Sequence, residues 1–326
     1  MSKASLDKDT SEVLLEVKNL KKYFNTPGGK LHAVDDVSFA IKKGQTLGIV
    51  GESGCGKSTT GRVILRLLEA TDGEIIYKGQ NIRELNKEQM RDLRKELQII
   101  FQDPFSSLDP RMTVSEIIEE PIKLNNLITD KTKRFERVLE LMDLVGLSRR
   151  MINTYPHELD GGRRQRIGIA RALALNTQFI VCDEPVSALD VSIQAQILNL
   201  MNELQEKLGL TYIFITHDLS VVNHFSDDIA VMYLGKLIEK APAEKLFDNP
   251  VHPYTQALLS AIPRPSLDRK MEKIILKGEI TSPINPEPVC RFANRCNYAE
   301  DICREKEPAL EEISPGHFVA CHLFKG

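Results

Sequence analysis

Short apolar segments recur along the chain at the length expected of sheet strands. Leu14–Val17 and Ala33–Ile41 alternate apolar and polar side chains, and Leu47–Val50 is a short apolar run. Two further apolar runs, Phe179–Cys182 and Tyr212–Thr216, lie in the second half of the chain. Because runs of this length suit strands better than helices, we predict a sheet built from both halves.

Other segments repeat their apolar residues at helical spacing, which predicts amphipathic helices. One covers Thr59–Ala70, and a helical block extends from Pro104 to about Asp160. A third helix lies between the two later strands and ends at Gly209, a residue suited to a helix C-terminus. The apolar positions that define these helices are Val63, Ile64, Leu67 and Leu68; Phe135, Val138, Leu139, Met142 and Val145; and Ile193, Ile197, Leu200, Met201, Leu204 and Leu208.

The order of these elements predicts an α/β fold. A strand, a helix and a second strand in succession form a βαβ unit, so the sheet is at least partly parallel. Residues 1–12 are predicted to be a flexible N-terminus and residues 13–250 the main domain, with a helical subdomain inserted at about residues 104–162. Prolines become frequent near Asn249, so residues 251–326 are predicted to form a small C-terminal domain.

Composition narrows the classes of protein that fit. The chain has 326 residues, of which 42% are hydrophobic and 27% charged, as in an ordinary globular protein. A net charge of −3 argues against a nucleic-acid binder that relies on bulk positive charge. No apolar run approaches the roughly 20 residues of a membrane helix, and the start carries no signal peptide. We therefore expect a cytosolic protein that reaches a membrane only through a partner.

One glycine-rich segment indicates that the chain binds phosphate groups. Residues 51–59 read Gly-Glu-Ser-Gly-Cys-Gly-Lys-Ser-Thr and fit the phosphate-loop pattern G-x-x-x-x-G-K-[ST]. The segment lies between an apolar strand and a helix, which places phosphates at the positive end of a helix dipole. Lys57 supplies charge and the Ser58 hydroxyl suits Mg²⁺. We therefore predict a nucleoside triphosphate site whose loop contacts come from Gly51, Ser53, Gly54, Cys55, Gly56, Lys57, Ser58 and Thr59.

Two adjacent acids end a later apolar strand. Phe179–Cys182 is followed by Asp183 and Glu184. Asp183, at the strand tip, is placed to hold Mg²⁺, and Glu184 is placed to polarise the attacking water. A solvated turn is the alternative, but it is the weaker reading when a phosphate loop precedes the acids in an α/β chain.

With these motifs in place, the chain resembles the ATP-binding subunit of an ABC transporter over about residues 14–250. The resemblance implies a P-loop (RecA-like) ATPase core with a mixed sheet. It also implies that Tyr23 stacks on adenine, that Gln102 senses Mg²⁺ and the γ-phosphate, and that His217 contacts the γ-phosphate. Residues Ser187–Asp190 match the loop that crosses the dimer interface in this family, with Asp190 acting on the facing subunit.

Members of this family work as an ATP sandwich. Each subunit supplies its phosphate loop, and the facing subunit closes the site with a signature loop that usually reads L-S-G-G-Q. Here that loop is Leu159-Asp160-Gly161-Gly162-Arg163, so two of the five positions differ. The resemblance implies that Asp160, Gly161 and Gly162 act in trans.

The aspartate at this position changes the electrostatics of the loop. An ionised Asp160 only accepts hydrogen bonds, whereas serine donates one to the phosphate. Two like unit charges about 4 Å apart repel by roughly 4 kcal/mol at an effective dielectric near 20. Arg163 is placed to pair with Asp160 and offset part of this repulsion. The alternative is neutral drift, because aspartate is a good helix N-cap. We favour an altered site and a heterodimer with unequal ATP sites.

Four cysteines gather near the C-terminus. Cys290, Cys296, Cys303 and Cys321 follow the spacing C-x5-C-x6-C-x17-C, which is more open than the usual pairs of structural zinc sites. A reducing compartment disfavours disulfides. The segment Asn249–Leu258 matches the extension of the oligopeptide and dipeptide importer branch, and that resemblance implies a [4Fe–4S] cluster. Zinc and four unligated buried thiols are the alternatives, whereas Cys55 and Cys182 are read as small core residues.

The resemblance also implies the partners. We expect a second, homologous ATPase subunit, two transmembrane permease subunits and an extracellular substrate-binding protein, with this chain at the cytoplasmic face of the membrane. The cargo is expected to be a di- or oligopeptide. Nickel, glutathione or an oligosaccharide are alternatives within the branch, and a tail that senses redox state or iron is another. A soluble ABC protein of translation or DNA maintenance fits less well, because the chain has neither a second cassette nor a long coiled coil.

Overall fold

The computed structural model describes residues 12–262, 274–276, 278 and 281–324, and these fall into two compact units. The first unit combines the chain up to Glu84 with the part from Phe214 onward, and the second comprises Leu85–Ile213. Of the predicted flexible N-terminus, all but Glu12 lies outside the described residues.

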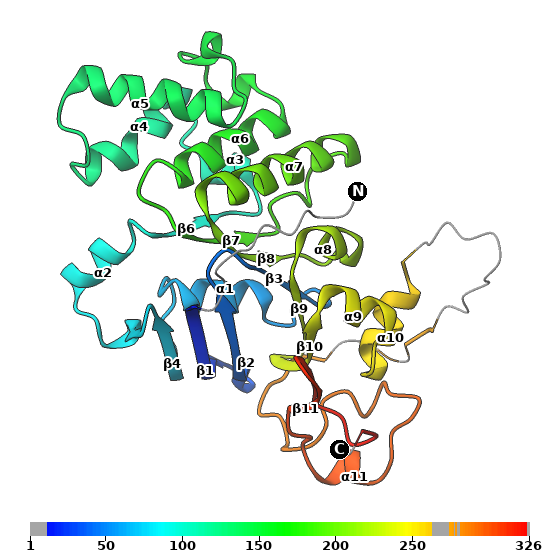
Figure 1. Cartoon of the computed structure of the whole chain (residues 1–326). Helices are drawn as coiled ribbons and strands as arrows, with labels where there is room; N and C mark the ends of the chain where they lie inside the picture. Colours follow the sequence, from blue (N-terminus) through cyan, green and yellow to red (C-terminus); the bar gives the residue numbers. More distant parts are fainter. Residues whose placement is uncertain (1–11, 263–273, 277, 279–280, 325–326) are drawn as a thin grey trace. The chain divides into compact units, whose positions relative to one another are not determined.

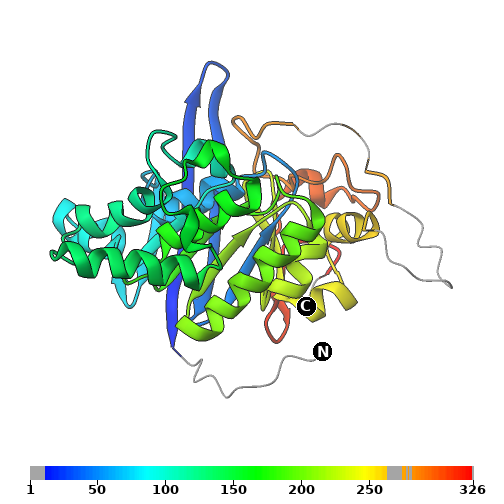
Figure 2. The ribbon, with the colours of Figure 1, turned by 90° about the horizontal axis from the view of Figure 1, so that it is seen from above.

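An antiparallel sheet in the first unit has the strand order β2-β1-β4-β5. Its strands are β1 (Val13–Thr26), β2 (Gly29–Lys42), β4 (Asp72–Tyr77) and β5 (Gln80–Asn81). Strands β1 and β2 form one long hairpin, which projects as a ribbon in Figure 2. Both predicted strands in this region are therefore confirmed but are longer than the apolar alternation indicated.

The second sheet of this unit is mixed. Its strands run in the order β11-β12-β10-β9-β3, and β3 is parallel to β9 while β9 and β10 are antiparallel. Every residue of β3 is buried. The strands are β3 (Thr46–Val50), β9 (Asp228–Tyr233), β10 (Lys236–Pro242), β11 (Glu311–Ser314) and β12 (His317–Val319).

The helices of the first unit are α1 (Lys57–Ile64), η1 (Ile82–Glu84), α8 (Leu219–Phe225), α9 (Ala243–Asp248), α10 (Pro253–Ser260) and α11 (Ile302–Glu305). Of these helices, α8 packs against β3 and α9 against β9 and β10 (Figure 1). An aromatic cluster joins α10 to the C-terminal segment, because the ring of Phe292 contacts those of Tyr233 and Tyr254 at centroid distances of 5.2 and 5.4 Å. The segment rich in cysteine therefore shares a core with the main sheet of the unit.

A buried carboxylate holds the start of the C-terminal extension, the segment that begins at Val251. Glu239 on β10 is fully buried and accepts hydrogen bonds from the amides of Val251 and His252 at 2.9 and 3.0 Å. The ring of His317 on β12 lies 2.7 Å from the same carboxylate. Because a buried charge is costly unless it is hydrogen-bonded, this network specifies where the chain leaves the sheet.

The second unit is mainly helical around a short parallel strand pair. Strand β6 (Leu97–Ile100) lies parallel to β7 (Phe179–Asp183). The helices are α2 (Lys87–Leu93), α3 (Pro104–Ser107), α4 (Val114–Leu124), α5 (Lys131–Leu144), η2 (Arg149–Met151), η3 (Pro156–Glu158), α6 (Gly161–Ala172) and α7 (Val191–Leu208). Helix α7 ends at Gly209 in the left-handed conformation, as predicted. The last strand, β8 (Thr211–Ile215), begins in this unit and ends in the first.

Two details of the predicted helices are wrong. Helix α1 ends at Ile64 rather than Ala70, because Arg66 adopts a left-handed conformation with φ 51° and Leu67 remains 47% exposed. Because much of the Leu67 side chain stays in solvent, its burial stabilises another turn only weakly. Phe135 on α5 is also exposed, since the buried face of this helix carries Val138, Leu141 and Met142.

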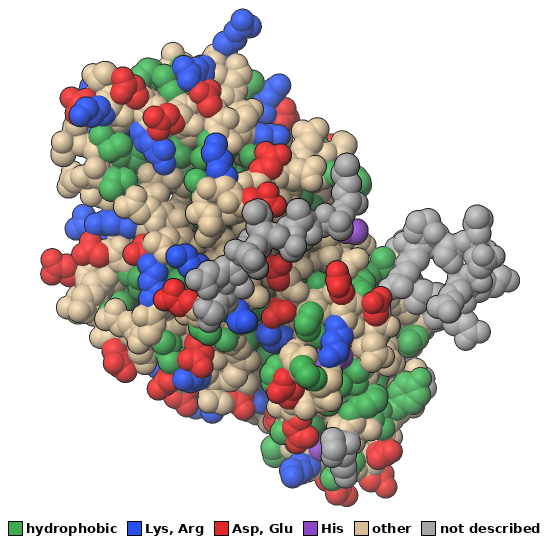
Figure 3. Space-filling view, in the orientation of Figure 1, with side chains coloured by type: hydrophobic (Ala, Val, Ile, Leu, Met, Phe, Trp, Pro, Cys, Tyr) green, Lys and Arg blue, Asp and Glu red, His purple; other side chains and the backbone are tan. Residues whose placement is uncertain are grey.

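Surface chemistry agrees with the composition. On the face shown in Figure 3, acidic and basic side chains are interspersed (Figure 3). Among the described residues, every helix is too short or too polar to span a lipid bilayer.

Acid should destabilise the start of α10. His252 is buried and its Nδ1 accepts the Tyr254 amide at 3.0 Å, and burial lowers its pKa to about 4. Because the unfolded chain binds this proton near pH 6.5, the stabilisation is present above that pH and is lost as pH falls toward 4. We expect the free energy of unfolding to fall by about 2 kcal/mol from this group between pH 7 and pH 5.

Urea unfolding of the full chain at both pH values measures this effect. His252→Asn keeps an N-cap acceptor without a titratable ring, so its loss of stability between the two pH values should be smaller. An equal loss in both proteins would assign the pH dependence to other groups.

Candidate nucleotide-binding site

The predicted phosphate loop connects β3 to α1 in the first unit. Lys57, the first residue of α1, is buried, and its ammonium group donates to the carbonyl oxygens of Gly51 at 2.8 Å and Glu52 at 3.1 Å. Ser53 and Gly54 are exposed at the turn, whereas Ser58 and Thr59 lie half-buried in the first turn of α1. The lysine is therefore held against the loop that is expected to surround the phosphates.

Close backbone approach fixes the path of this loop. A Cβ atom added to Gly56, which has φ 104°, would lie 2.1 Å from the carbonyl oxygen of Ala33 on β2. One added to Gly51 would lie 2.2 Å from the carbonyl oxygen of Met232 on β9. Cys55 is buried between them, and burial raises the pKa of its thiol. Its predicted role as a small core residue fits this position.

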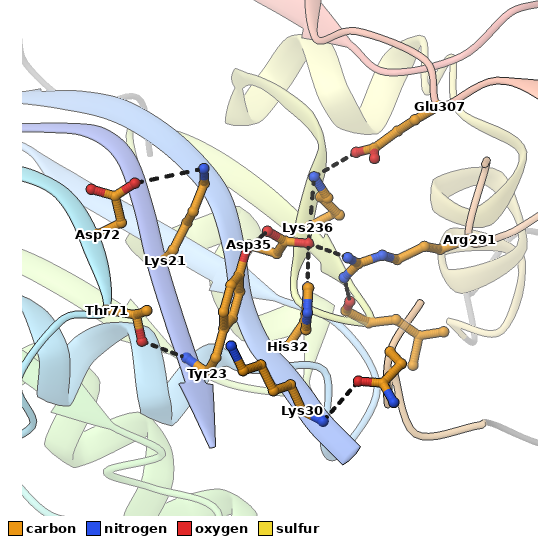
Figure 4. Close-up of polar contacts among 12 residues, drawn as sticks. Lys21, Tyr23, Lys30, His32, Asp35, Thr71, Asp72, Lys236, Arg291 and Glu307 are labelled. Carbon is orange, nitrogen blue, oxygen red and sulfur yellow. Dashed lines mark hydrogen bonds and ion pairs between the residues drawn. The ribbon is translucent and has the colours of Figure 1, made fainter. Parts of the chain in front are cut away.

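Tyr23, the predicted adenine platform, belongs to a charged cluster on the hairpin (Figure 4). Its ring stacks on His32 at 3.8 Å, and its hydroxyl donates to Asp35 at 2.5 Å. His32 and Arg291 also contact the Asp35 carboxylate, and the Lys236 ammonium lies 3.7 Å away. The cluster therefore holds one face of the Tyr23 ring and its hydroxyl group.

These contacts shift the titration of both acids. Burial alone would raise the pKa of Asp35, but hydrogen bonds from Tyr23 and His32 and the charges of Lys236 and Arg291 lower it to about 2. Burial and the hydrogen bond to Asp35 raise the pKa of the Tyr23 hydroxyl. Asp35 is therefore an anion and Tyr23 a neutral donor near neutral pH.

Sequence reasoning missed a second cluster, which reaches the phosphate loop itself. Arg295 binds both carboxylate oxygens of Glu52, with N–O distances of 2.7 and 3.1 Å. The Glu52 amide donates to the Tyr254 hydroxyl at 2.9 Å. Glu52 occupies a variable position of the loop pattern, and its partners lie more than 200 residues away, so the sequence carries no local signal for these contacts.

In the second unit, the predicted acids follow β7. Asp183 is its last residue and is buried. Glu184 has φ 48°, an uncommon conformation for a residue with a side chain, and its carboxylate accepts the Gln102 amide at 2.9 Å. The structure thus brings together Glu184 and Gln102, which the sequence predicted separately.

The altered signature loop also lies in the second unit. Asp160 is the N-cap of α6 and accepts the Arg163 amide at 2.8 Å. Arg163 also forms an ion pair with the Asp160 carboxylate at 3.3 Å, so both contacts considered from the sequence are present. Gly161 begins α6, and Gly162 packs against Ile193 of α7, where an added Cβ would lie 2.6 Å from the isoleucine.

The two remaining predicted residues follow other elements. Asp190 is the exposed N-cap of α7. His217, which belongs to the first unit, is exposed between β8 and α8. Thr216 before it is buried, and the Thr216 hydroxyl accepts the Asp218 amide at 3.0 Å, which orders this turn.

The four C-terminal cysteines are buried or half-buried. Burial raises the pKa of Cys290 and Cys321 to about 11, and the charges of Cys296 and Cys303 contribute to both shifts. The Cys290 amide donates to the carbonyl oxygen of Cys303 at 3.0 Å. This donor set has the chemistry of a thiolate cluster site. Across the described residues, however, no three or more His, Cys, Asp or Glu side chains are arranged to hold a metal ion.

Two family models match the chain. Residues 34–187 match "ABC transporter", and residues 238–303 match "Oligopeptide/dipeptide transporter, C-terminal region". The matches cover the phosphate loop, Glu184 and the segment that carries Arg291 and Arg295.

Known proteins resemble the chain over most of its length. The oligopeptide transport ATP-binding protein AppF of Bacillus subtilis (strain 168) is 55% identical, covering 96% of this chain and 98% of that protein. OppF of the same strain is 51% identical, covering 95% of this chain and 97% of that protein. The solved dimeric ATP-binding cassette MJ0796, bound to ADP and Pi, matches with a TM-score of 0.65 and 30% identity, covering 71% of this chain and 99% of that chain.

The crowding at Gly56 predicts that alanine is tolerated less well there than at Gly54 in the same loop. Gly56→Ala and Gly54→Ala both place a side chain at positive φ, which costs about 1–2 kcal/mol. Only the Cβ at position 56 meets the Ala33 carbonyl, since a Cβ added at position 54 would have no non-neighbouring atom within 4 Å. Gly56→Ala should therefore lower the free energy of unfolding by about 1–3 kcal/mol more than Gly54→Ala, and weaken MgATP binding more.

Denaturant unfolding and calorimetric titration with MgATP measure the two effects. Equal losses in both variants would show that the Ala33 carbonyl does not constrain the loop.

Proposed function

The chain belongs to the ABC transporter family of ATP-binding proteins, and from that premise we propose that it is the ATP-hydrolysing subunit that energises a membrane importer of di- or oligopeptides. The observation that carries this proposal is the 55% identity to an oligopeptide transport ATP-binding protein over 96% of the chain. The match to the oligopeptide/dipeptide C-terminal region supports the same branch.

We assign the phosphate contacts to the loop and to the start of α1. The backbone amides after Gly51 and the Lys57 ammonium neutralise phosphate charge, and the Ser58 hydroxyl and Asp183 hold Mg²⁺. When bound, Mg²⁺ supplies further charge neutralisation on the phosphates. The Tyr23 ring, fixed by His32 and Asp35, provides a flat surface for adenine.

Hydrolysis requires an oriented water and a stabilised γ-phosphate. Glu184 polarises the water, and the Gln102 amide, 2.9 Å from its carboxylate, holds that carboxylate in one orientation. His217 donates to the γ-phosphate. Phosphoryl transfer depends mostly on positioning and charge neutralisation, and these residues are this chain's contribution to both.

The proposal places a second, homologous ATPase subunit across the nucleotide. Gly161 and Gly162 at the start of α6, with Asp160 and Asp190, act on the ATP of the facing subunit. The cassette MJ0796 is described as dimeric, which supports this arrangement. Two transmembrane permease subunits and an extracellular binding protein complete the importer, and they hold this chain peripherally at the cytoplasmic face of the membrane.

Asp160 makes the two ATP sites unequal. Its carboxylate caps α6 and pairs with Arg163, so the local helix start is intact, but the group it would present to a phosphate is an acceptor. The site that this loop completes is therefore impaired, while the site built on Lys57 and Glu184 is competent. A partner that carries a serine at the matching position gives a heterodimer with one main catalytic site.

Separate glutamate substitutions test this asymmetry. In the assembled transporter, Glu184→Gln should reduce ATP turnover about 100-fold or more, because it removes the group that polarises the water. The matching substitution in the partner should cost much less. The control is Glu206→Gln on the exposed face of α7, which should turn over ATP like the wild type. Equal losses from the two catalytic glutamates would refute unequal sites.

We also propose that Cys290, Cys296, Cys303 and Cys321 hold a [4Fe–4S] cluster with a structural role. The Cys290 amide donates to the Cys303 carbonyl oxygen at 3.0 Å, and a small extension with short helices and strands needs such a crosslink. Zinc on the same thiolates, or a cluster that senses redox state and gates the ATPase, are the competing assignments.

Metal analysis of protein purified without oxygen separates these assignments. We expect the purified protein to contain iron and sulfide and to show an absorbance band at about 400 nm. Cys303→Ala should lose the iron and lower the melting temperature, whereas Cys182→Ala, which removes a buried thiol from β7, should keep the iron. Zinc without iron would contradict the cluster, and an ATPase rate that follows the cluster's oxidation state would favour a sensor.

A further inference from the structure

The C-terminal extension contacts the nucleotide-binding elements of its own unit at three places. Asn285 exchanges hydrogen bonds with the backbone of Lys30 at the hairpin tip, with 2.8 Å for both contacts. Arg291 binds Asp35, which holds the Tyr23 hydroxyl (Figure 4). Arg295 binds the phosphate-loop residue Glu52. The last contact is the most direct, since it reaches the loop that precedes Lys57.

Glu52 needs this partner for an electrostatic reason. It places a carboxylate in a loop that is expected to surround a triphosphate, so an unpaired charge there would repel the ligand. Arg295 binds both of its oxygens and is itself only 10% exposed, whereas Glu52 is 24% exposed. A bidentate, partly buried pair of this kind fixes the direction of the carboxylate as well as neutralising it.

The same residue connects the arginine to the catalytic lysine. The Glu52 carbonyl accepts the Lys57 ammonium at 3.1 Å, while the Glu52 amide donates to the buried Tyr254 hydroxyl. The guanidinium of Arg295 lies over the Tyr233 ring at 5.8 Å, which restricts its position from the side of the sheet. Glu52 is thus held through its side chain and its amide by the extension and α10.

We propose that Arg295 is a positioning residue of the ATP site, which acts through Glu52 to keep a carboxylate of the phosphate loop neutralised and turned away from the nucleotide. This inference rests on the proposed role of the phosphate loop. It makes the extension part of the nucleotide site, in addition to its role as an appended domain. The affinity for a more highly charged nucleotide should depend on it more.

Nucleotide binding by the purified full chain tests the proposal. Arg295→Gln should raise the dissociation constant of MgATP on the order of tenfold, because an unpaired Glu52 carboxylate remains beside the triphosphate. The effect on MgADP should be smaller. Adding Glu52→Gln to Arg295→Gln removes that charge and should restore most of the MgATP affinity. A purely structural role of Arg295 predicts no such recovery.

Three further variants complete the experiment. Arg304→Gln changes an exposed arginine of α11 and should bind MgATP like the wild type. Tyr254→Phe removes the acceptor of the Glu52 amide without changing charge, so it should weaken MgATP and MgADP alike. Should Arg295→Gln fail to fold, as judged by thermal unfolding without nucleotide, Arg295→Lys carries the same comparison. Arg295→Lys keeps the positive charge but not the bidentate geometry. Its loss of affinity for MgATP should therefore be smaller than the loss expected of Arg295→Gln, and adding Glu52→Gln should again restore the affinity.

Lys57→Ala distinguishes the failure of this inference from the failure of the proposed function. If Lys57→Ala abolishes MgATP binding while Arg295→Gln binds like the wild type, the positioning role is overturned and the phosphate loop stands. If Arg295→Gln weakens binding but the double variant does not recover, the charge argument is overturned. MgATP binding that is unchanged in Lys57→Ala would instead overturn the assignment of the loop itself.

Discussion

The path of the phosphate loop between two backbone carbonyls is the constraint on which the candidate site depends. On one side the loop meets the Ala33 carbonyl of the hairpin, and on the other the Met232 carbonyl of β9. Only glycine fits at these contacts, so the loop is fixed by backbone that belongs to two different sheets of the same unit. The position of Lys57 at the start of α1 follows from that path, as does the position of Glu52, which the extension then binds.

Local patterns predicted the elements whose signals lie within a few neighbouring residues. The apolar runs located β3, β7 and β8, and the glycine at position 209 located the end of α7. Helix α1 was predicted too long, because its apolar spacing continues past a residue that turns left-handed. Phe135 belongs to the apolar pattern that predicted α5, yet it is exposed because the helix buries a neighbouring face. Periodicity shows that a face is apolar, whereas tertiary contacts decide which residues of that face are covered.

Residues of the candidate site likewise fall into those that the sequence predicted and those that it did not. Lys57, Asp183 and Glu184 could be proposed from the sequence because each belongs to a short motif beside an apolar strand. Arg291 and Arg295 were not found, since they contact Asp35 and Glu52 across more than 240 residues and belong to no spacing pattern. Charge complementarity at that separation becomes visible only when the fold brings the segments together.

One turn therefore serves two purposes in the extension. Arg291 and Arg295 lie between Cys290 and Cys296, and the amides of Arg295 and Cys296 both donate to the Phe292 carbonyl, at 2.9 and 3.0 Å. Phe292 packs in turn on Tyr254, whose hydroxyl accepts the Glu52 amide. Because the cysteines and the arginines share this short stretch of backbone, the turn that positions the thiols also positions the backbone from which both guanidinium groups reach Asp35 and Glu52. The structural role proposed for the cysteines and the positioning role proposed for Arg295 therefore depend on the same short segment of backbone.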